Sequence, residues 1–266
     1  MSIEQYNIAK QMYLQNKSLR KISEELNINR KLLSKKLKED NIIIRDKNKN
    51  QIIKSKSKYS FDEKIFEKID TKEKAYWLGF LYADGYVNSE KGIELTLKSE
   101  DLCHIEAFKN FLKSNHAIEY REKVNAYRLS IYSVKMANDL IKLGCLQNKS
   151  LILTFPTEQQ VPKKYISHFM RGYFDGDGCI SYGQGQLRFS VLGCKEFLSR
   201  YESIILDVLR RKDPNKWGQD GQAFNIRYSG NKQVNKIFNF LYKDANIYLK
   251  RKYNKFAVLR QKSQKS

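Results

Sequence analysis

Two segments of the sequence end in an aspartate followed by glycine, and their surroundings match. The segments YWLGFLYADGY and FMRGYFDGDGC put Asp84 and Asp177 at equivalent places, 93 residues apart. Each aspartate closes an apolar helical pattern, and Gly85 and Gly178 suit a left-handed C-cap. A carboxylate in the last turn faces the negative end of the helix dipole, at a cost of about 0.3–1 kcal/mol. We therefore expect a cation beside these carboxylates.

Small residues recur on one face of each helix. Gly79 and Ala83 stand four residues apart in the first helix, as do Gly172 and Gly176 in the second. Because small side chains let two backbones approach closely, we expect the helices to pack through these faces. The two carboxylates then lie side by side and repel each other unless they are protonated or a metal bridges them. Mg²⁺ prefers oxygen ligands and can promote phosphodiester hydrolysis, so it is the expected cofactor.

The duplication extends beyond the motif and predicts the fold class. Each motif is followed by an alternating strand pattern, a helical pattern, a second strand pattern and a closing helix. Each half therefore reads approximately α-β-β-α-β-β-α, and the expected class is α+β with two pseudo-symmetric repeats. The matched strands are residues 93–97 and 187–191, then 126–133 and 223–230, and the helices are residues 101–112, 195–209, 134–143 and 232–243.

The N-terminal part is strongly basic. Residues 1–60 hold 15 Lys and Arg against 6 Asp and Glu, which gives +9 of the total charge. Their apolar residues form three short helical patterns that resemble a helix-turn-helix, whose second helix enters the major groove. That second helix carries Arg30, Lys31 and Lys35 as candidate DNA contacts.

Four segments are expected along the chain. They are a helix-turn-helix-like DNA-binding module at 1–46, a basic linker at 47–69, a first repeat at 70–155 and a second repeat with a basic C-terminal tail at 156–266.

The two motifs, WLGFLYADG and MRGYFDGDG, resemble the signature helices of single-chain LAGLIDADG homing endonucleases, and the resemblance covers roughly residues 70–261. It implies a central helix pair and two saddle-shaped antiparallel sheets astride duplex DNA. It also implies Mg²⁺-dependent cleavage of both strands across the minor groove of a long recognition site, by a nuclease of a mobile element. On this resemblance Asp84 and Asp177 are catalytic and bind the metal.

The resemblance further implies a basic residue near the scissile phosphates in each half. Lys149 in LQNKS and Lys250 in IYLKRK occupy the matching places after the last helix of each repeat, and Arg251 is an alternative to Lys250. These two lysines complete the expected catalytic set.

Strand alternation selects the side chains expected to read DNA. If Tyr127, Leu129 and Ile131 are buried under helices, the residues between them face outward. Arg, Asn, Gln and Ser can recognise the donor and acceptor pattern of the major groove. The expected DNA-facing residues are Arg128, Ser130 and Tyr132, then Gln186, Arg188 and Ser190, and then Asn225, Arg227 and Ser229.

The amino-acid composition limits the kinds of molecule that the protein is expected to bind. The chain of 266 residues carries 50 Lys and Arg against 29 Asp and Glu, a net charge of +21 that points to a polyanion. The sequence lacks the basic amphipathic helix typical of membrane binding, a signal core and a Cys-x-x-Cys pair. We therefore expect an intracellular DNA-associated protein, no membrane partner and reduced cysteines.

Two other functions stay open. Helix-turn-helix modules joined to LAGLIDADG-like domains also resemble transcription regulators that have lost cleavage, and an intron-splicing maturase would bring the same basic sheets to structured RNA. Retention of both Asp84 and Asp177 favours the nuclease. Because the second motif supplies in cis what a one-motif relative takes from a second subunit, we expect a monomer.

Overall fold

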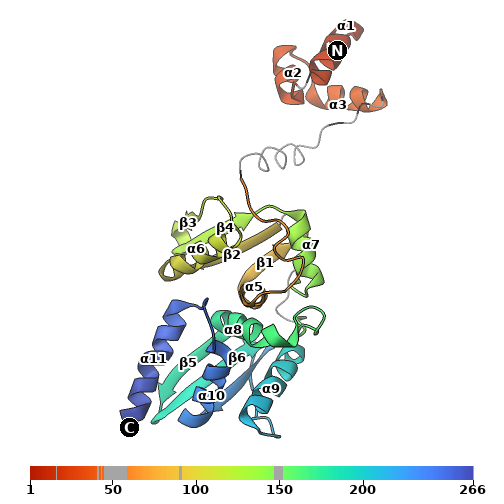
Figure 1. Cartoon of the computed structure of the whole chain (residues 1–266). Coiled ribbons are helices and arrows are strands. Elements are labelled where there is room, and N and C mark those ends of the chain that lie inside the picture. Colours follow the sequence, from red (N-terminus) through yellow and green to blue (C-terminus); the bar gives the residue numbers. More distant parts are fainter. Residues whose placement is uncertain are drawn as a thin grey trace. The chain divides into compact units, whose positions relative to one another are not determined.

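The computed structural model describes residues 1–15, 17–40, 42, 44, 59–89, 92–146 and 152–265. The chain divides into two compact units, Met1–Lys58 and Tyr59–Ser266 (Figure 1). Each unit has its own hydrophobic core. Among the residues thus described, no helix combines the length and the apolar character needed to cross a membrane.

The N-terminal unit contains the three predicted helices, packed around a small core that includes Ala9, Ile22 and Leu33. Ser18 caps the second helix by accepting a backbone N–H, and Asn27 takes the left-handed backbone, with φ of 48°, that turns the chain toward the third. The helices are α1 (Ile3–Leu14), α2 (Leu19–Glu25) and α3 (Arg30–Glu39).

The second unit contains two repeats with the same order of elements, which confirms the predicted α+β class and the αββαββα repeat. The first repeat consists of α5 (Lys72–Ala83), β1 (Gly85–Asn88), β2 (Gly92–Lys98), α6 (Leu102–Phe111), β3 (Glu119–Arg121), β4 (Ala126–Ile131) and α7 (Val134–Lys142). The second consists of α8 (Ile166–Asp177), β5 (Gly178–Gly183), β6 (Gln186–Gly193), α9 (Lys195–Leu209), β7 (Gly218–Asp220), β8 (Ala223–Ser229) and α10 (Asn231–Tyr242), and α11 (Lys250–Lys265) follows it.

Each repeat forms a four-stranded antiparallel sheet, with strand orders β1-β2-β4-β3 and β5-β6-β8-β7. The central strands pair Leu95 with Leu129 in the first sheet and Phe189 with Tyr228 in the second, and all four side chains are buried. In the first repeat α6 and α7 pack on the sheet, and in the second α9, α10 and α11 do so (Figure 1). The alternate side chains of the central strands therefore point away from the helices.

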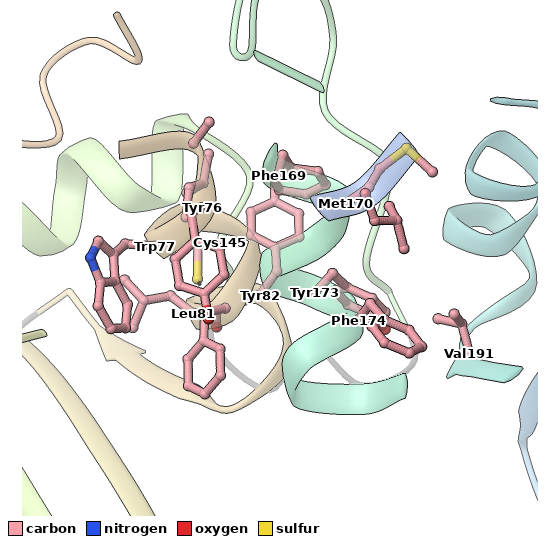
Figure 2. Close-up of a cluster of buried hydrophobic side chains, with 14 of the residues drawn as sticks. Tyr76, Trp77, Leu81, Tyr82, Cys145, Phe169, Met170, Tyr173, Phe174 and Val191 are labelled. Carbon is pink, nitrogen blue, oxygen red and sulfur yellow. Dashed lines mark hydrogen bonds between the residues drawn. The ribbon is translucent and has the colours of Figure 1, made fainter. Parts of the chain in front are cut away.

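The helix pair α5 and α8 lies at the centre of the second unit, where it contributes many aromatic side chains to the core. Tyr82 of α5 meets Phe169 of α8 edge to face, with ring centroids 5.0 Å apart (Figure 2). On the side of its own repeat, Trp77 lies with its ring 4.8 Å from that of Phe108 in α6. Each central helix thus packs both on its partner and on its own repeat.

The linker predicted at 47–69 is too long at its C-terminal end. Ile65, Phe66 and Ile69 are buried in the core of the second unit, which begins at Tyr59. This segment forms turns and no regular helix or strand, so its burial depends on the repeat against which it packs.

Candidate active site and nucleic-acid interface

Glycines set the distance between α5 and α8. A Cβ atom at Gly79 would lie 2.0 Å from the carbonyl oxygen of Phe169, and one at Gly172 would lie 2.0 Å from the carbonyl oxygen of Tyr76. Phe169 is three residues before Gly172, and Tyr76 is three residues before Gly79. The two contacts are therefore equivalent, as a pseudo-twofold axis between the helices requires. Any larger side chain at either position would push the two backbones apart.

The other small residues continue this interface to the end that carries the carboxylates. A Cβ at Gly176 would lie 2.3 Å from the Cβ of Ala83 and 3.1 Å from the Oδ2 atom of Asp84. Asp84 is the C-cap of α5, and Asp177, the neighbour of Gly176, is the last residue of α8. The structure therefore brings Asp84 and Asp177 to the same end of the helix pair.

The predicted left-handed caps at Gly85 and Gly178 are wrong, because neither glycine has a positive φ. Gly178 is extended, and both glycines begin a strand directly after the helix. A Cβ at Gly85 would lie 2.7 Å from the carbonyl oxygen of Leu81, and one at Gly178 would lie 2.5 Å from that of Phe174. Glycine is needed at both positions because the chain turns back over the last helical turn and leaves no room for a Cβ atom. A left-handed backbone conformation is not the reason.

Lys252 places a positive charge at the C-terminal end of α8. Its side chain is buried, with 7% exposure. Its Nζ donates hydrogen bonds to four carbonyl oxygens, those of Phe174 (2.7 Å), Asp175 (2.7 Å), Gly176 (3.3 Å) and Gly178 (2.6 Å). An ammonium group at this place satisfies carbonyls that the helix leaves without partners and offsets the negative end of its dipole.

The charge of Lys252 also acts on the carboxylate pair. Burial lowers the pKa of Lys252, while the negative charges of Asp175, Asp84 and Asp177 oppose that shift. The ammonium of Lys252 is therefore a positive charge near the two motif aspartates.

The side chains of the KRK run at residues 250–252 point to different surroundings. Lys250 is exposed at the start of α11, and the exposed Arg251 pairs with Asp101 of the first repeat, with Nη2 and Oδ2 3.0 Å apart. Lys252 is the member of the KRK run that reaches α8, because the phase of α11 turns its side chain inward. Lys149 lies outside the described residues.

Residues 246–252 connect the second repeat to the first. Asn246 donates a side-chain hydrogen bond to Glu73 of α5, and the pair of Arg251 with Asp101 makes a second link between the repeats. Between them, the backbone N–H of Leu249 donates to the Oδ2 atom of Asp175 at 2.8 Å. This segment fixes the start of α11 and hence the position of Lys252.

Asp175 lies inside the helix pair, with 1% exposure. Its carboxylate also accepts hydrogen bonds from the hydroxyls of Tyr76, at 2.8 Å, and Tyr242. Burial raises the pKa of Asp175, and the bonds from Tyr242 and Leu249 oppose that shift. The Asp175 carboxylate thus links α8 to α5 and α10. It is shielded from solvent, whereas Asp84 is exposed and Asp177 is half-buried.

Most of the residues predicted to read DNA lie on outward faces of the sheets. Arg128 is half-buried and Ser130 exposed on β4, whereas Tyr132 lies beyond the end of that strand, because Ser133 already caps α7. On the second sheet, β6 carries Gln186, Arg188 and Ser190, and β8 carries Asn225, Arg227 and Ser229. The register sets Arg188 opposite Ser229 and Ser190 opposite Arg227, so these side chains form one patch. On α3 of the N-terminal unit, Arg30, Lys31 and Lys35 are exposed.

Solved structures resemble the chain closely enough to decide its fold. The LAGLIDADG meganuclease I-CpaMI, bound to uncleaved DNA, superposes with a TM-score of 0.50 over 72% of this chain and 92% of its own, at 12% identity. A lysine-to-alanine variant of I-SmaMI superposes with a TM-score of 0.51 over 72% and 92%, at 14% identity. The chain has a LAGLIDADG-like fold. In this LAGLIDADG-like fold the two motif helices are the central pair α5 and α8.

Comparison of sequences gives weaker relationships than comparison of structures. No protein-family model matches the chain. Over 142 residues it is 24% identical to a probable translation initiation factor IF-2 of Thermococcus kodakarensis. That match covers 49% of this chain but only 12% of that protein, so the LAGLIDADG-like chain corresponds to a small part of it.

Proposed function

We propose that the chain is a site-specific endonuclease that cleaves both strands of duplex DNA across the minor groove in the presence of Mg²⁺. The observation that carries the proposal is the placement of Asp84 and Asp177 at one end of two closely packed, symmetry-related helices. The two strands of a duplex are also related by twofold axes. A twofold helix pair can therefore present one carboxylate to each strand.

The carboxylate pair suits Mg²⁺. In the part of the chain that the structure describes, no cluster of three or more His, Cys, Asp and Glu side chains could hold a metal. Mg²⁺ does not require such a cluster, because it commonly binds one or two carboxylates and keeps water and substrate phosphates as its other ligands. Asp84 and Asp177 would hold the ion, which when bound would stabilise negative charge on the phosphodiester oxygens.

Lys252 gives the site a second source of positive charge. Its ammonium lies at the end of α8 and acts on both motif aspartates. This charge reduces the repulsion between the two carboxylates and between them and an approaching phosphate. Lys250, which is exposed at the start of α11, stays the candidate for contact with the scissile phosphate of the second half.

Two sheets and the N-terminal unit provide the proposed DNA contacts. The arginines Arg128, Arg188 and Arg227 lie on the outward sheet faces with Ser, Asn and Gln side chains around them, a set that can recognise base edges. The exposed basic residues of α3 would add phosphate contacts outside the central site. A single chain carrying two different sheets would recognise a long target of low symmetry as a monomer.

Cleavage of a randomised duplex library tests the proposal. The protein is incubated with the library and Mg²⁺, and the cut ends are sequenced. Asp84→Asn and Asp177→Asn should abolish double-strand cleavage but keep binding in Ca²⁺, whereas Asp207→Asn, at an exposed aspartate of α9, should leave cleavage unchanged. Full cleavage by either motif variant would exclude the assigned site. Binding without cleavage by the wild-type protein would favour a regulator, and selective binding of structured RNA would favour a maturase.

A further inference from the structure

The outward face of the first sheet carries a cluster of charged side chains. The guanidinium of Arg128 lies between two carboxylates: Nη1 donates to Glu94 at 3.2 Å and Nη2 donates to Glu119 at 2.7 Å. Glu94 also accepts a hydrogen bond from the hydroxyl of Ser130 at 3.2 Å. The cluster therefore fixes the position of the arginine before any ligand arrives.

Strand register builds this cluster. Glu119 of β3 lies directly opposite Arg128 of β4, and Glu94 of β2 lies opposite Ser130. The three charged side chains consequently point to the same face. The Nε atom of Arg128 is buried and has no hydrogen-bond partner among the described residues, so the two Nη groups form the outward end of its side chain.

The cluster is acidic in a strongly basic protein. Two carboxylates and one guanidinium sum to −1, whereas the whole chain carries +21. In the second sheet the arginines bond to neutral amides, Arg188 to Gln184 at 2.7 Å and Arg227 to Asn225 at 3.2 Å. Among the described residues, neither of these arginines forms an ion pair with a carboxylate. Arg128 of the first sheet is therefore paired with carboxylates, whereas Arg188 and Arg227 of the second sheet bond to neutral side chains.

General affinity for DNA does not account for the carboxylates of the first sheet, because they repel phosphates. The ion pair with Glu119 contributes little to stability, since that side chain is 58% exposed, and the pair with Glu94, whose side chain is 35% exposed, is still open to solvent. A carboxylate beside a major groove has a different use, because it accepts a hydrogen bond from the N4 amino group of cytosine. The outward end of an arginine matches the N7 and O6 acceptors of guanine.

We propose that Glu94 is a specificity-determining residue that makes one half of the target require a G·C pair opposite the centre of the first sheet. Glu94 holds Arg128 for the guanine and itself accepts a hydrogen bond from the paired cytosine. Base pairs that present an acceptor to Glu94 are repelled, so the residue selects by exclusion as well as by attraction. This inference rests on the proposed DNA-binding function.

Selection of bound sequences tests the role of Glu94 without the need for cleavage. The full chain is equilibrated in Ca²⁺ with a randomised duplex library, and bound molecules are sequenced for the wild type, Glu94→Gln, Glu119→Gln and Glu106→Gln. The last variant is a matched control, because Glu106 is an exposed carboxylate on α6, which packs on the opposite side of the sheet.

The wild type should select a G·C pair at one position that Glu94→Gln no longer requires, with a loss of preference of roughly 10-fold to 100-fold. The Glu94 variant should also bind random duplex more tightly. Glu119→Gln should give a smaller loss at the same position, and Glu106→Gln should give none. Unchanged base preferences in Glu94→Gln would overturn the inference, as would tighter binding to random duplex without any change in preference. Failure of the wild type to select any duplex would instead overturn the proposed function, and the inference with it.

Discussion

Replacement of Lys252 by methionine tests the arrangement at the end of the helix pair most directly. Methionine keeps the unbranched, apolar character and most of the length of the side chain but removes the ammonium. Four carbonyl oxygens around α8 then lose a donor. The carboxylates Asp84 and Asp177 also lose a positive charge that acts on both.

The expected loss of stability follows from burial and from the number of bonds. A hydrogen bond to a charged group contributes about 1.5–3 kcal/mol, but the four bonds share one ammonium and do not add fully. Removal of one partner of a buried charged interaction typically lowers the free energy of unfolding by about 3–5 kcal/mol. We expect the effect of Lys252→Met to fall in that range. For a domain of this size that corresponds to a decrease in Tm of about 6–20 °C.

Thermal and denaturant unfolding of matched variants provides the assay. Lys250→Met removes the same charge from an exposed position of the same helix and should change stability by no more than about 0.5 kcal/mol. Addition of Asp84→Asn to Lys252→Met should cost less than the sum of the two single changes, because it relieves the repulsion that the lysine offset. If Lys252→Met and Lys250→Met were equally stable, the reasoning on this site would be wrong.

Three further outcomes can be measured. Burial lowers the pKa of His104 from its ordinary value of 6.5 to about 4. Because the unfolded chain takes up the proton first, the free energy of unfolding should fall by about 3 kcal/mol as the pH decreases from above 6.5 to 4. His104→Phe should remove that part of the pH dependence in denaturant unfolding. Gly172→Ala would put a Cβ 2.0 Å from a backbone oxygen and should lower Tm clearly, whereas Gly183→Ala meets only the movable end of an arginine side chain at 3.2 Å and should change it little. Deletion of residues 1–58 should weaken binding to the selected duplex and reduce its salt dependence without abolishing cleavage, as filter binding at several salt concentrations would reveal.

Local periodicity in the sequence determined the order and type of the elements. The helix predicted at 195–209 is α9 with the same bounds, because apolar residues at spacings of three and four mark it over its whole length. The strands around Leu129 and Ile226 alternate as predicted, since one face of each is covered by helices. Duplication of the pattern made the pseudo-symmetry of the fold predictable as well.

The candidate site could be predicted only in part. Gly79 and Gly172 identified the contact face, and the position of the two aspartates at the helix ends followed from it. The conformation of Gly178 was mispredicted, because a glycine after a helix fits either a left-handed cap or a close turn into a strand. The local sequence is the same in both cases, and only the position of the following strand distinguishes them.

Tertiary structure alone decided which charged residues meet. Lys252 reaches the end of α8 because residues 246–252 bond to both repeats and set the phase of α11, and none of those contacts is local in sequence. Glu94 and Arg128 are 34 residues apart and meet through the register of β2 with β4. Periodicity reports which face of an element is buried, but charged side chains find their partners through register, helix phase and chain crossings, which depend on the packing of the whole repeat.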